Sequence, residues 1–289
     1  MPAIEVNNLQ KFFGKTRAVD DISFSVAKGE IFGFLGPNGA GKTTTIRCMM
    51  DFIRPTSGGI KIIGLDAQQD TVELKKKIGY LSGGTKLYNR WTGQDHIDFY
   101  KKLNGRHDSS VMLASRLNLD VSLKAKQLSS GNRQKLAIVL ALMQAPEILI
   151  LDEPTLALDP LLQNEIYELL EDLSKNGTTI FMSSHNLGEV DRICHRVGII
   201  KRGKMVATEG IRSLKEKRIH SIHVYFEDKY DKKDFLMEGV SIVKELPDAL
   251  ILTLKGDINI LIRALNKYHL KGVEITPASL EDIFMEYYE

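Results

Sequence analysis

A glycine-rich segment near the start of the chain constrains its fold more than any other feature of the sequence. The segment consists of Gly36, Pro37, Asn38, Gly39, Ala40, Gly41, Lys42 and Thr43. It fits the pattern G-x-x-x-x-G-K-[ST], in which glycines let backbone N–H groups approach an anion closely. An apolar strand is expected before it, at 30–35, and a helix after it, at 42–53, whose N-terminus also attracts anions. We therefore interpret the segment as a phosphate-binding P-loop rather than as a turn without a ligand.

The last residues of this loop predict which phosphate compound it binds. The Lys42 ammonium group would reach the β- and γ-phosphates, and the Thr43 hydroxyl would hold Mg²⁺. A nucleoside triphosphate with Mg²⁺ is the ligand that these two groups fit.

The overall composition is that of an ordinary globular protein. The chain has 289 residues, 43% of them hydrophobic and 26% charged, which is enough for one large core and a smaller second domain. A net charge of +2 gives no support for nucleic acid as the main partner. Cys48 and Cys194 lie far apart without metal-ligand spacing, so we expect reduced thiols and a cytosolic protein.

No segment of the sequence has the pattern of a signal peptide or of a membrane span. The N-terminus lacks a basic region followed by an apolar run. The most apolar stretch, 136–151, is interrupted by Gln144, Pro146 and Glu147, so it falls short of the roughly 18 apolar residues that a spanning helix needs. We expect a chain that can dock on a membrane but does not span it.

The hydrophobic pattern predicts an α/β domain over residues 1–215. Residues 4–9 and 19–26 alternate as antiparallel strands, with an exposed turn expected at 11–14. Later apolar strands alternate with helices, which indicates a mostly parallel sheet covered on both faces. The region 82–130 is polar and helical, so we expect it to be a helical insertion.

The pattern changes after a charged run at 212–218, and residues 216–289 are expected to form a small second domain. Its predicted order of elements is β-α-β-β-α-β, which is typical of a ferredoxin-like α+β fold. The last helix is predicted at 279–288. Stabilisation or dimerisation is the simpler interpretation of this domain, and regulation or contact with a partner is the alternative.

Two carboxylates and a histidine are expected to lie beside the P-loop. Asp152 and Glu153 follow the buried strand 147–152, so the first carboxylate can hold Mg²⁺ through water and the second can activate an attacking water. His185 follows the strand 178–183, at the carboxyl edge of the sheet where ligands gather. The simpler alternative is a charged pair that only ends a strand, next to a structural histidine.

The ordered set of motifs extends beyond these residues. It comprises Phe13, the P-loop, Leu128–Lys135, Ile148–Thr155, Leu158, Asp159 and His185. Together they resemble the ATP-binding subunit of an ABC transporter, and the resemblance covers residues 3–215. The sequence LSSGNRQK is its most specific part, since it is similar to the Leu-Ser-Gly-Gly-Gln signature of that family. Residues 279–288 are also similar to the tail of such subunits in bacterial export systems with a separate permease.

The resemblance implies a role for each matching residue. ATP would be bound by Phe13, which stacks on adenine, and by Gly36, Pro37, Asn38, Gly39, Ala40, Gly41, Lys42, Thr43 and Thr44. Thr43 and Asp152 would hold Mg²⁺, Glu153 would be the general base, and His185 would contact the γ-phosphate. The residues that would act on the ATP of the opposite subunit are Ser129, Ser130, Gly131 and Asn132, and Asp159 would lie in a turn at the dimer contact. Two subunits would then enclose two ATP molecules around a two-fold axis.

The implied function is ATP hydrolysis that powers transport, export in particular, through a separate transmembrane permease. The chain would lie peripherally at the cytoplasmic face of the cell membrane, as a homodimer or as half of a heterodimer. The main alternative is a non-transport ABC ATPase that acts on nucleic acid or ribosomes. A single ATP-binding domain, without a heptad run or a basic arm, argues against it. The sequence does not name the transported substrate.

The chain departs from the family pattern at three places. The family usually has a Gln shortly after the sequence Ile-Gly-Tyr-Leu, where it contacts Mg²⁺ and faces the permease. Here residues 78–81 are followed by Ser82, Gly83 and Gly84. The other unusual residues are Ser130 and Asn132 in the signature and Leu156 in the turn before Asp159. The first departure suggests a third interpretation, a weakened ATPase that serves as one half of a heterodimer.

Overall fold

The computed structural model of the chain describes residues 1–84, 86–104, 108–156, 158–216 and 219–277. Its contacts divide the chain into two compact units, Met1–Thr208 and Glu209–Glu289. The units divide after Thr208, earlier than the boundary predicted between residues 215 and 216. The predicted position lies near the end of helix α8 (Ile211–Glu216), inside the second unit. Within the described ranges, no helix is both long and apolar enough to cross a membrane.

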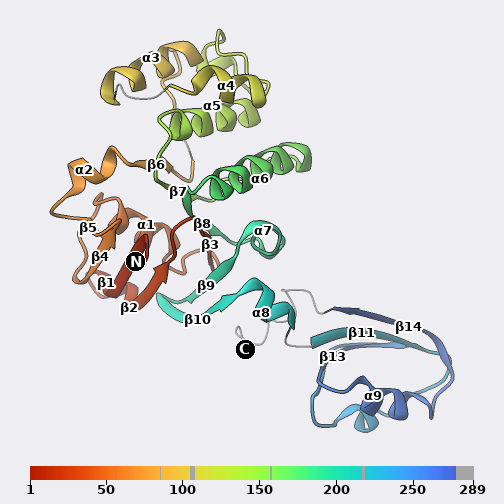
Figure 1. Cartoon of the computed structure of the whole chain (residues 1–289). Helices are drawn as coiled ribbons and strands as arrows, with labels where there is room; N and C mark the ends of the chain where they lie inside the picture. Colours follow the sequence, from red (N-terminus) through yellow and green to blue (C-terminus); the bar gives the residue numbers. More distant parts are fainter. Residues whose placement is uncertain (85, 105–107, 157, 217–218, 278–289) are drawn as a thin grey trace. The chain divides into compact units, whose positions relative to one another are not determined.

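A six-stranded sheet forms the centre of the first unit (Figure 1). In order across the sheet, its strands are β10 (Lys204–Gly210), β9 (Arg196–Lys201), β3 (Ile31–Leu35), β8 (Thr179–Ser184), β7 (Ile148–Asp152) and β6 (Ile78–Leu81). Neighbouring strands from β9 to β6 are parallel. Every residue of β3, β7 and β8 is buried, as expected for a parallel sheet covered on both faces. The carboxyl ends of these strands therefore meet at one edge.

An antiparallel sheet forms the second layer of this unit. In order, its strands are β2 (Thr16–Val26), β1 (Ile4–Phe13), β4 (Ser57–Ile62) and β5 (Leu65–Asp66). The turn predicted at 11–14 is wrong, because β1 continues through Phe13 and pairs with β2 to its end. The chain turns at Gly14, whose φ of 56° suits glycine better than other residues.

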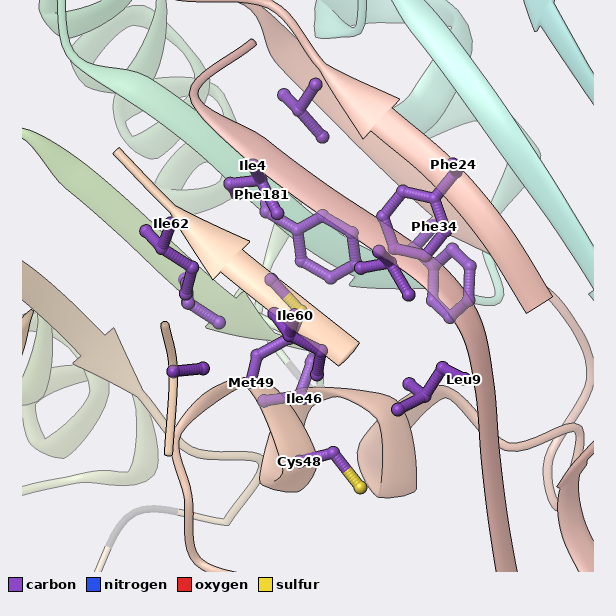
Figure 2. Packing of buried hydrophobic residues seen from close by; sticks show 14 of the residues in the cluster. Ile4, Leu9, Phe24, Phe34, Ile46, Cys48, Met49, Ile60, Ile62 and Phe181 are labelled. Carbon is purple, nitrogen blue, oxygen red and sulfur yellow. The ribbon is translucent and has the colours of Figure 1, made fainter. Parts of the chain in front are cut away.

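Aromatic side chains join the two sheets. Phe24 of β2 stacks on Phe32 of β3 and Phe181 of β8, with ring centroids 5.6 and 5.8 Å apart. Figure 2 shows Phe24 and Phe181 in a continuous cluster that extends to Ile46 of helix α1 (Lys42–Met49). The helix that follows the P-loop is therefore fixed to both sheets through its buried face.

Helices complete the first unit. Those near the sheets are α1, α2 (Thr71–Lys75), α6 (Pro160–Lys175) and α7 (Leu187–Ile193). The insertion predicted at 82–130 contains α3 (Gly93–Asn104), α4 (Ser110–Arg116) and the 3-10 turn η1 (Ala125–Gln127), and α5 (Ser130–Leu142) follows it. Figure 1 shows α3 and α4 packed against α5. The helix predicted at 42–53 ends at Met49, since Asp51 takes a left-handed φ of 50°.

The second unit is built on one antiparallel sheet. In order, its strands are β12 (Val240–Leu246), β13 (Ala249–Lys255), β11 (Ile219–Phe226) and β14 (Leu270–Pro277). Helix α9 (Ile258–Leu265) and the 3-10 turn η2 (Lys232–Phe235) share an apolar core with the sheet. The predicted β-α-β-β-α-β order is present, with the first helix reduced to η2. The helix predicted at 279–288 lies outside the described residues.

Candidate nucleotide-binding and catalytic site

The P-loop joins β3 to α1 and lies close against neighbouring backbone. A Cβ atom at Gly36 would be 2.4 Å from the Ile200 carbonyl oxygen, and one at Gly41 would be 2.5 Å from that of Ala18. Gly41 also has a φ of 112°, which L side chains rarely allow. A pocket of about 200 Å³ opens at the loop, lined by Ala18, Pro37, Asn38, Gly39, Gly41, Lys42, Thr43, Thr44 and Glu153.

Lys42 is almost entirely buried beside this pocket. Its Nζ donates to the carbonyl oxygen of Gly36 at 2.6 Å and lies 3.2 Å from Glu153 Oε1. A buried ammonium group costs free energy unless negative groups compensate for its lost hydration. The carbonyl and the carboxylate provide that compensation here, and phosphate oxygens could share it.

Asp152 lies at the carboxyl end of β7 and faces the start of α1. Its Oδ1 accepts hydrogen bonds from Thr43 Oγ1 at 3.2 Å and from Ser183 Oγ at 2.6 Å. Within the described ranges, no group of three or more His, Cys, Asp or Glu side chains could hold a metal by itself. A hydroxyl and one carboxylate still suit Mg²⁺, which takes most other ligands from water and phosphates.

Glu153 follows Asp152 in an unusual backbone conformation. Its φ is 52°, in the left-handed region that costs an L residue about 1–2 kcal/mol. The backbone is held there because the Glu153 N–H lies 3.2 Å from Ser183 O and 3.1 Å from Ser183 Oγ. As a result, the carboxylate lies between Lys42 Nζ, at 3.2 Å, and Nδ1 of His185, at 2.7 Å.

His185 adds a residue from the end of β8 to the site, beside those that follow β3 and β7. It follows β8 directly, its side chain is 45% exposed, and its Nδ1 donates to Glu153 Oε2. The P-loop, Asp152, Glu153 and His185, which are far apart in the sequence, therefore meet at the carboxyl edge of the parallel sheet. This is the edge where ligands bind in open α/β sheets.

The signature residues begin helix α5. Ser129 is its N-cap, and its Oγ accepts from the Asn132 N–H at 3.2 Å. Ser129 and Ser130 are exposed, so the positive helix N-terminus is open to an anion. Gln134 Nε2 donates to the Pro154 carbonyl oxygen at 2.6 Å, which ties α5 to the segment that follows Glu153.

Phe13 and Asp159 lie at the ends of their elements. Phe13 ends β1 with 51% of its surface exposed, and Lys11 Nζ lies 5.0 Å from the centre of its ring. The exposed ring offers a stacking surface. Asp159 is the N-cap of α6, because its Oδ1 accepts from the Leu162 N–H at 3.0 Å.

The segment without the family's Gln lies beside Asp152. A Cβ atom at Gly83 would be 3.3 Å from Asp152 Oδ2. Residue 83 is therefore at the nucleotide site, although it offers no side-chain ligand.

Two groups behind the site escaped the sequence analysis. The first is Ser183, which is hard to recognise from the sequence because it lies within the entirely buried strand β8. The second is Glu189 of α7, which is buried and accepts hydrogen bonds from Thr155 Oγ1 at 2.6 Å and Ser184 Oγ at 2.5 Å. Burial raises the pKa of Glu189, and these hydroxyls partly oppose the rise. The sequence did indicate that Glu189 is buried, because it lies four residues before the apolar Ile193 and therefore on the same face of the helix.

These contacts define the class of protein. A P-loop with a buried lysine, a Thr43–Asp152 pair and a carboxylate held beside a histidine are the groups that hydrolysis of a nucleoside triphosphate requires. They occur on a parallel α/β sheet with an added antiparallel sheet and a helical insertion. The molecule is a P-loop nucleotide hydrolase.

Known proteins narrow this class to one family. The family described as "ABC transporter" matches residues 19–156. The linearmycin resistance ATP-binding protein LnrL of Bacillus subtilis is 37% identical over 211 residues, covering 71% of this chain and 68% of LnrL. MJ1023 of Methanocaldococcus jannaschii, called an uncharacterized ABC transporter ATP-binding protein, is 34% identical over 293 aligned positions, covering 99% of both chains.

A solved structure agrees with these relatives. The dimeric structure of MJ0796, a bacterial ABC transporter cassette, is 26% identical and has a TM-score of 0.67, covering 72% of this chain and 99% of that one. The chain belongs to the ATP-binding proteins of ABC transporters, which are ATP-hydrolysing enzymes. The predicted family, α/β P-loop fold and ATPase activity are confirmed.

Proposed function

We propose that this chain uses Glu153 to hydrolyse MgATP and so powers export through a transmembrane permease that is a separate chain. The observation that carries the proposal is the position of the Glu153 carboxylate between Lys42 and His185, beside the Thr43–Asp152 pair. Groups arranged in this way orient a water molecule and stabilise charge on a transferring phosphoryl group. Export is supported by the name of LnrL, which connects that relative with resistance to linearmycin.

The side chains of the site suggest how the bond is broken. Lys42 and the P-loop N–H groups bind the β- and γ-phosphates, while Phe13 stacks on adenine. Glu153 takes a proton from the attacking water as the water oxygen bonds to the γ-phosphorus and the bond to the ADP oxygen breaks. The products are ADP and inorganic phosphate. His185 orients Glu153 through Nδ1 and can reach a γ-phosphate oxygen through Nε2.

Mg²⁺ fits the oxygen atoms at the start of α1. Thr43 and Asp152 would hold it, the latter partly through water, and their 3.2 Å contact already brings both ligands together. The bound ion would neutralise charge on the phosphates. Gly83 adds no side chain to this set, so water is expected in the place of the family's Gln.

The active form is inferred to contain a second ATP-binding subunit, like the dimeric MJ0796 cassette. The exposed start of α5, with Ser129, Ser130, Gly131 and Asn132, would act on the ATP of the opposite subunit. A γ-phosphate suits a helix N-terminus. The turn that Asp159 ends would lie at the contact between subunits, and a homodimer is the simplest arrangement.

A groove in the first unit offers a place for the permease. It has a volume of about 690 Å³ and is lined by the segment after β6 and by parts of α3 and α5, with aromatic groups from Tyr80, Tyr88, Phe99 and Tyr100. Gly83, which lies beside Asp152, also lines this groove. A permease docked there would therefore touch the nucleotide site, and the chain would work at the cytoplasmic face of the membrane.

The Glu153→Gln variant tests the proposal. Gln keeps the size of the side chain but cannot accept a proton, so kcat should fall at least about 100-fold while MgATP still binds. Glu168→Gln, at an exposed position of α6, is the matched control and should keep the parent rate. Turnover by Glu153→Gln at the parent rate would contradict the assigned base. Normal turnover by the parent subunit alone would argue against the weakened half of a heterodimer.

A further inference from the structure

Glu189 is the buried acidic residue of α7, and its carboxyl group accepts two hydrogen bonds from residues close to the catalytic site in sequence. Oε1 accepts from Thr155 Oγ1 at 2.6 Å, and Oε2 accepts from Ser184 Oγ at 2.5 Å. Each hydroxyl has a single proton to donate, so an ionised carboxylate satisfies both at once. The amide of a glutamine side chain cannot do so, because it has only one acceptor oxygen.

The two hydroxyl residues belong to the segments that carry Glu153 and His185. Thr155 lies two residues after Glu153, and Ser184 directly precedes His185. Ser184 Oγ also accepts from the Asn186 N–H at 2.9 Å, which fixes the chain on the far side of His185. The side chain of Glu189 therefore spans the two segments whose own side chains meet in the 2.7 Å contact between Glu153 and His185.

Packing alone does not account for an acid at this position. Glu189 is only 3% exposed, and burying a carboxylate costs free energy even when hydroxyl groups compensate for lost hydration. The neighbouring Glu153 adds a further unfavourable interaction with a negative charge, which His185 partly offsets. An apolar residue would fill the same space without this cost, so a role in the site offers a reason for the acid.

We propose that Glu189 is a positioning residue for ATP hydrolysis, because its carboxyl group holds Thr155 and Ser184 and thereby keeps Glu153 and His185 in contact. Glu189 does not touch the nucleotide site itself. Its effect passes through the backbone of the two segments, as ligand-orienting groups act behind a metal or a catalytic base. The inference rests on the proposed role of Glu153 as general base.

The first test is Glu189→Gln in the full chain, with kcat, the KM for MgATP, nucleotide affinity and Tm measured together. One of the two hydroxyls loses its acceptor, so we expect kcat to fall about tenfold. KM and nucleotide affinity should stay within about twofold of the parent, because the P-loop is not altered. Glu168→Gln is again the control. A folded Glu189→Gln variant with the parent kcat would overturn the proposal.

A second variant separates positioning from general damage to the core. Thr155→Val keeps the shape of the side chain but removes its hydroxyl, so it breaks one arm of the same contact. If both changes act through that contact, the double variant should have nearly the kcat of the slower single variant. Effects on kcat that multiply would contradict a shared mechanism. If Glu189→Gln does not fold, Thr155→Val alone should still lower kcat with KM unchanged, and the parent kcat in that variant would overturn the proposal.

The outcome for Glu153→Gln distinguishes this inference from the proposed function. Loss of hydrolysis in Glu153→Gln together with the parent kcat in Glu189→Gln and Thr155→Val would refute only the role of Glu189. Retained hydrolysis in Glu153→Gln would instead refute the assigned base, on which the role of Glu189 depends.

Discussion

The two units of the chain bury different kinds of side chain. Among the described residues of the first unit, the buried charged ones are Glu30, Lys42, Asp152 and Glu189. In the described part of the second unit, the buried polar residues are the uncharged Ser221 and Thr253. The core of the second unit is apolar, with Phe226 packed against Phe235 and Tyr268.

This difference distinguishes the unit that carries the proposed catalytic site from the unit that we infer to be structural. Burying a charge costs free energy unless a partner compensates for it, so such residues persist where they serve a purpose besides packing. Lys42, Asp152 and Glu189 all lie at or directly behind the proposed site, whereas Glu30 pairs with Arg196 away from it. We infer that the second unit stabilises the protein and takes no direct part in hydrolysis.

The largest effect is expected when a buried charge is removed from the first unit, and this change tests whether buried charges mark the site. Lys42→Ala should lower MgATP affinity and reduce hydrolysis by about 100-fold or more, because the phosphates lose their cation and Glu153 loses its partner. Hydrolysis rates and nucleotide binding measure the effect. Lys61→Ala, at an exposed lysine of β4, is the control. A Lys42→Ala variant with near-parent activity would show that buried charge does not mark the site.

A matched pair of core truncations, one in each unit, tests whether loss of stability in the second unit affects hydrolysis. Leu149→Ala in the first unit and Leu252→Ala in the second both remove fully buried methyl groups, and each should destabilise its unit by about 2–5 kcal/mol. At temperatures where both variants remain folded, Leu252→Ala should keep kcat within about twofold of the parent. Calorimetry and ATPase assays provide the measurements, and a large loss of kcat in Leu252→Ala would give the second unit a functional role.

The pH dependence of stability gives a smaller effect, specific to the first unit. The pKa of Glu189 is raised above its ordinary value of 4.5, chiefly by burial, so the protonated acid favours the folded state. Its contribution to stability is present below pH 4.5 and is lost as pH rises through the folded-state pKa. Glu189→Gln does not titrate, so its Tm relative to the parent should rise between pH 5 and pH 8.

The groups that interact electrostatically with Glu189 are Glu153, His185, Tyr167 and Cys194, and they are the same in both proteins. A difference that stays constant from pH 5 to pH 8 would contradict the raised pKa.

The two cysteines offer the mildest test. Burial raises the pKa of Cys48 to about 11 and raises that of Cys194 well above its ordinary value, so neither should react with a thiol reagent at pH 8 while the first unit is folded. Both belong to that unit, so the rate of labelling reports its unfolding alone. Leu149→Ala should speed labelling and Leu252→Ala should not. Equal acceleration by both variants would mean that the units unfold together.

Contiguous motifs were the part of the site that the sequence could predict. The P-loop and the Asp152–Glu153 pair depend on short-range backbone geometry, which residue types at fixed spacing reveal. The placement of His185 followed from the rule that parallel strands end at one edge. The family then followed from the order of these motifs.

The remaining features depend on contacts between segments that are distant in sequence. Ser183 is a small polar residue in a buried strand, and only the partner strand reveals that it bonds Asp152. The carboxyl group of Glu189 accepts a hydrogen bond from Thr155, which is 34 residues away in the sequence. The turn near Phe13 was misplaced because aromatic residues suit both an exposed turn and the end of a strand, and pairing with β2 decides between them.

The backbone conformation of Glu153 has a consequence for engineering. A residue held at a φ of 52° is strained unless it is glycine, which adopts that conformation without a steric penalty. A Glu153→Gly protein should lose this strain, but it should also lose the carboxylate that compensates for the buried Lys42 ammonium group, and it should hydrolyse no ATP. Laboratory evolution for heat-resistant protein does not act on the base alone, because any glycine at this position must come with a change that compensates for Lys42, and such a library needs a parallel selection for turnover.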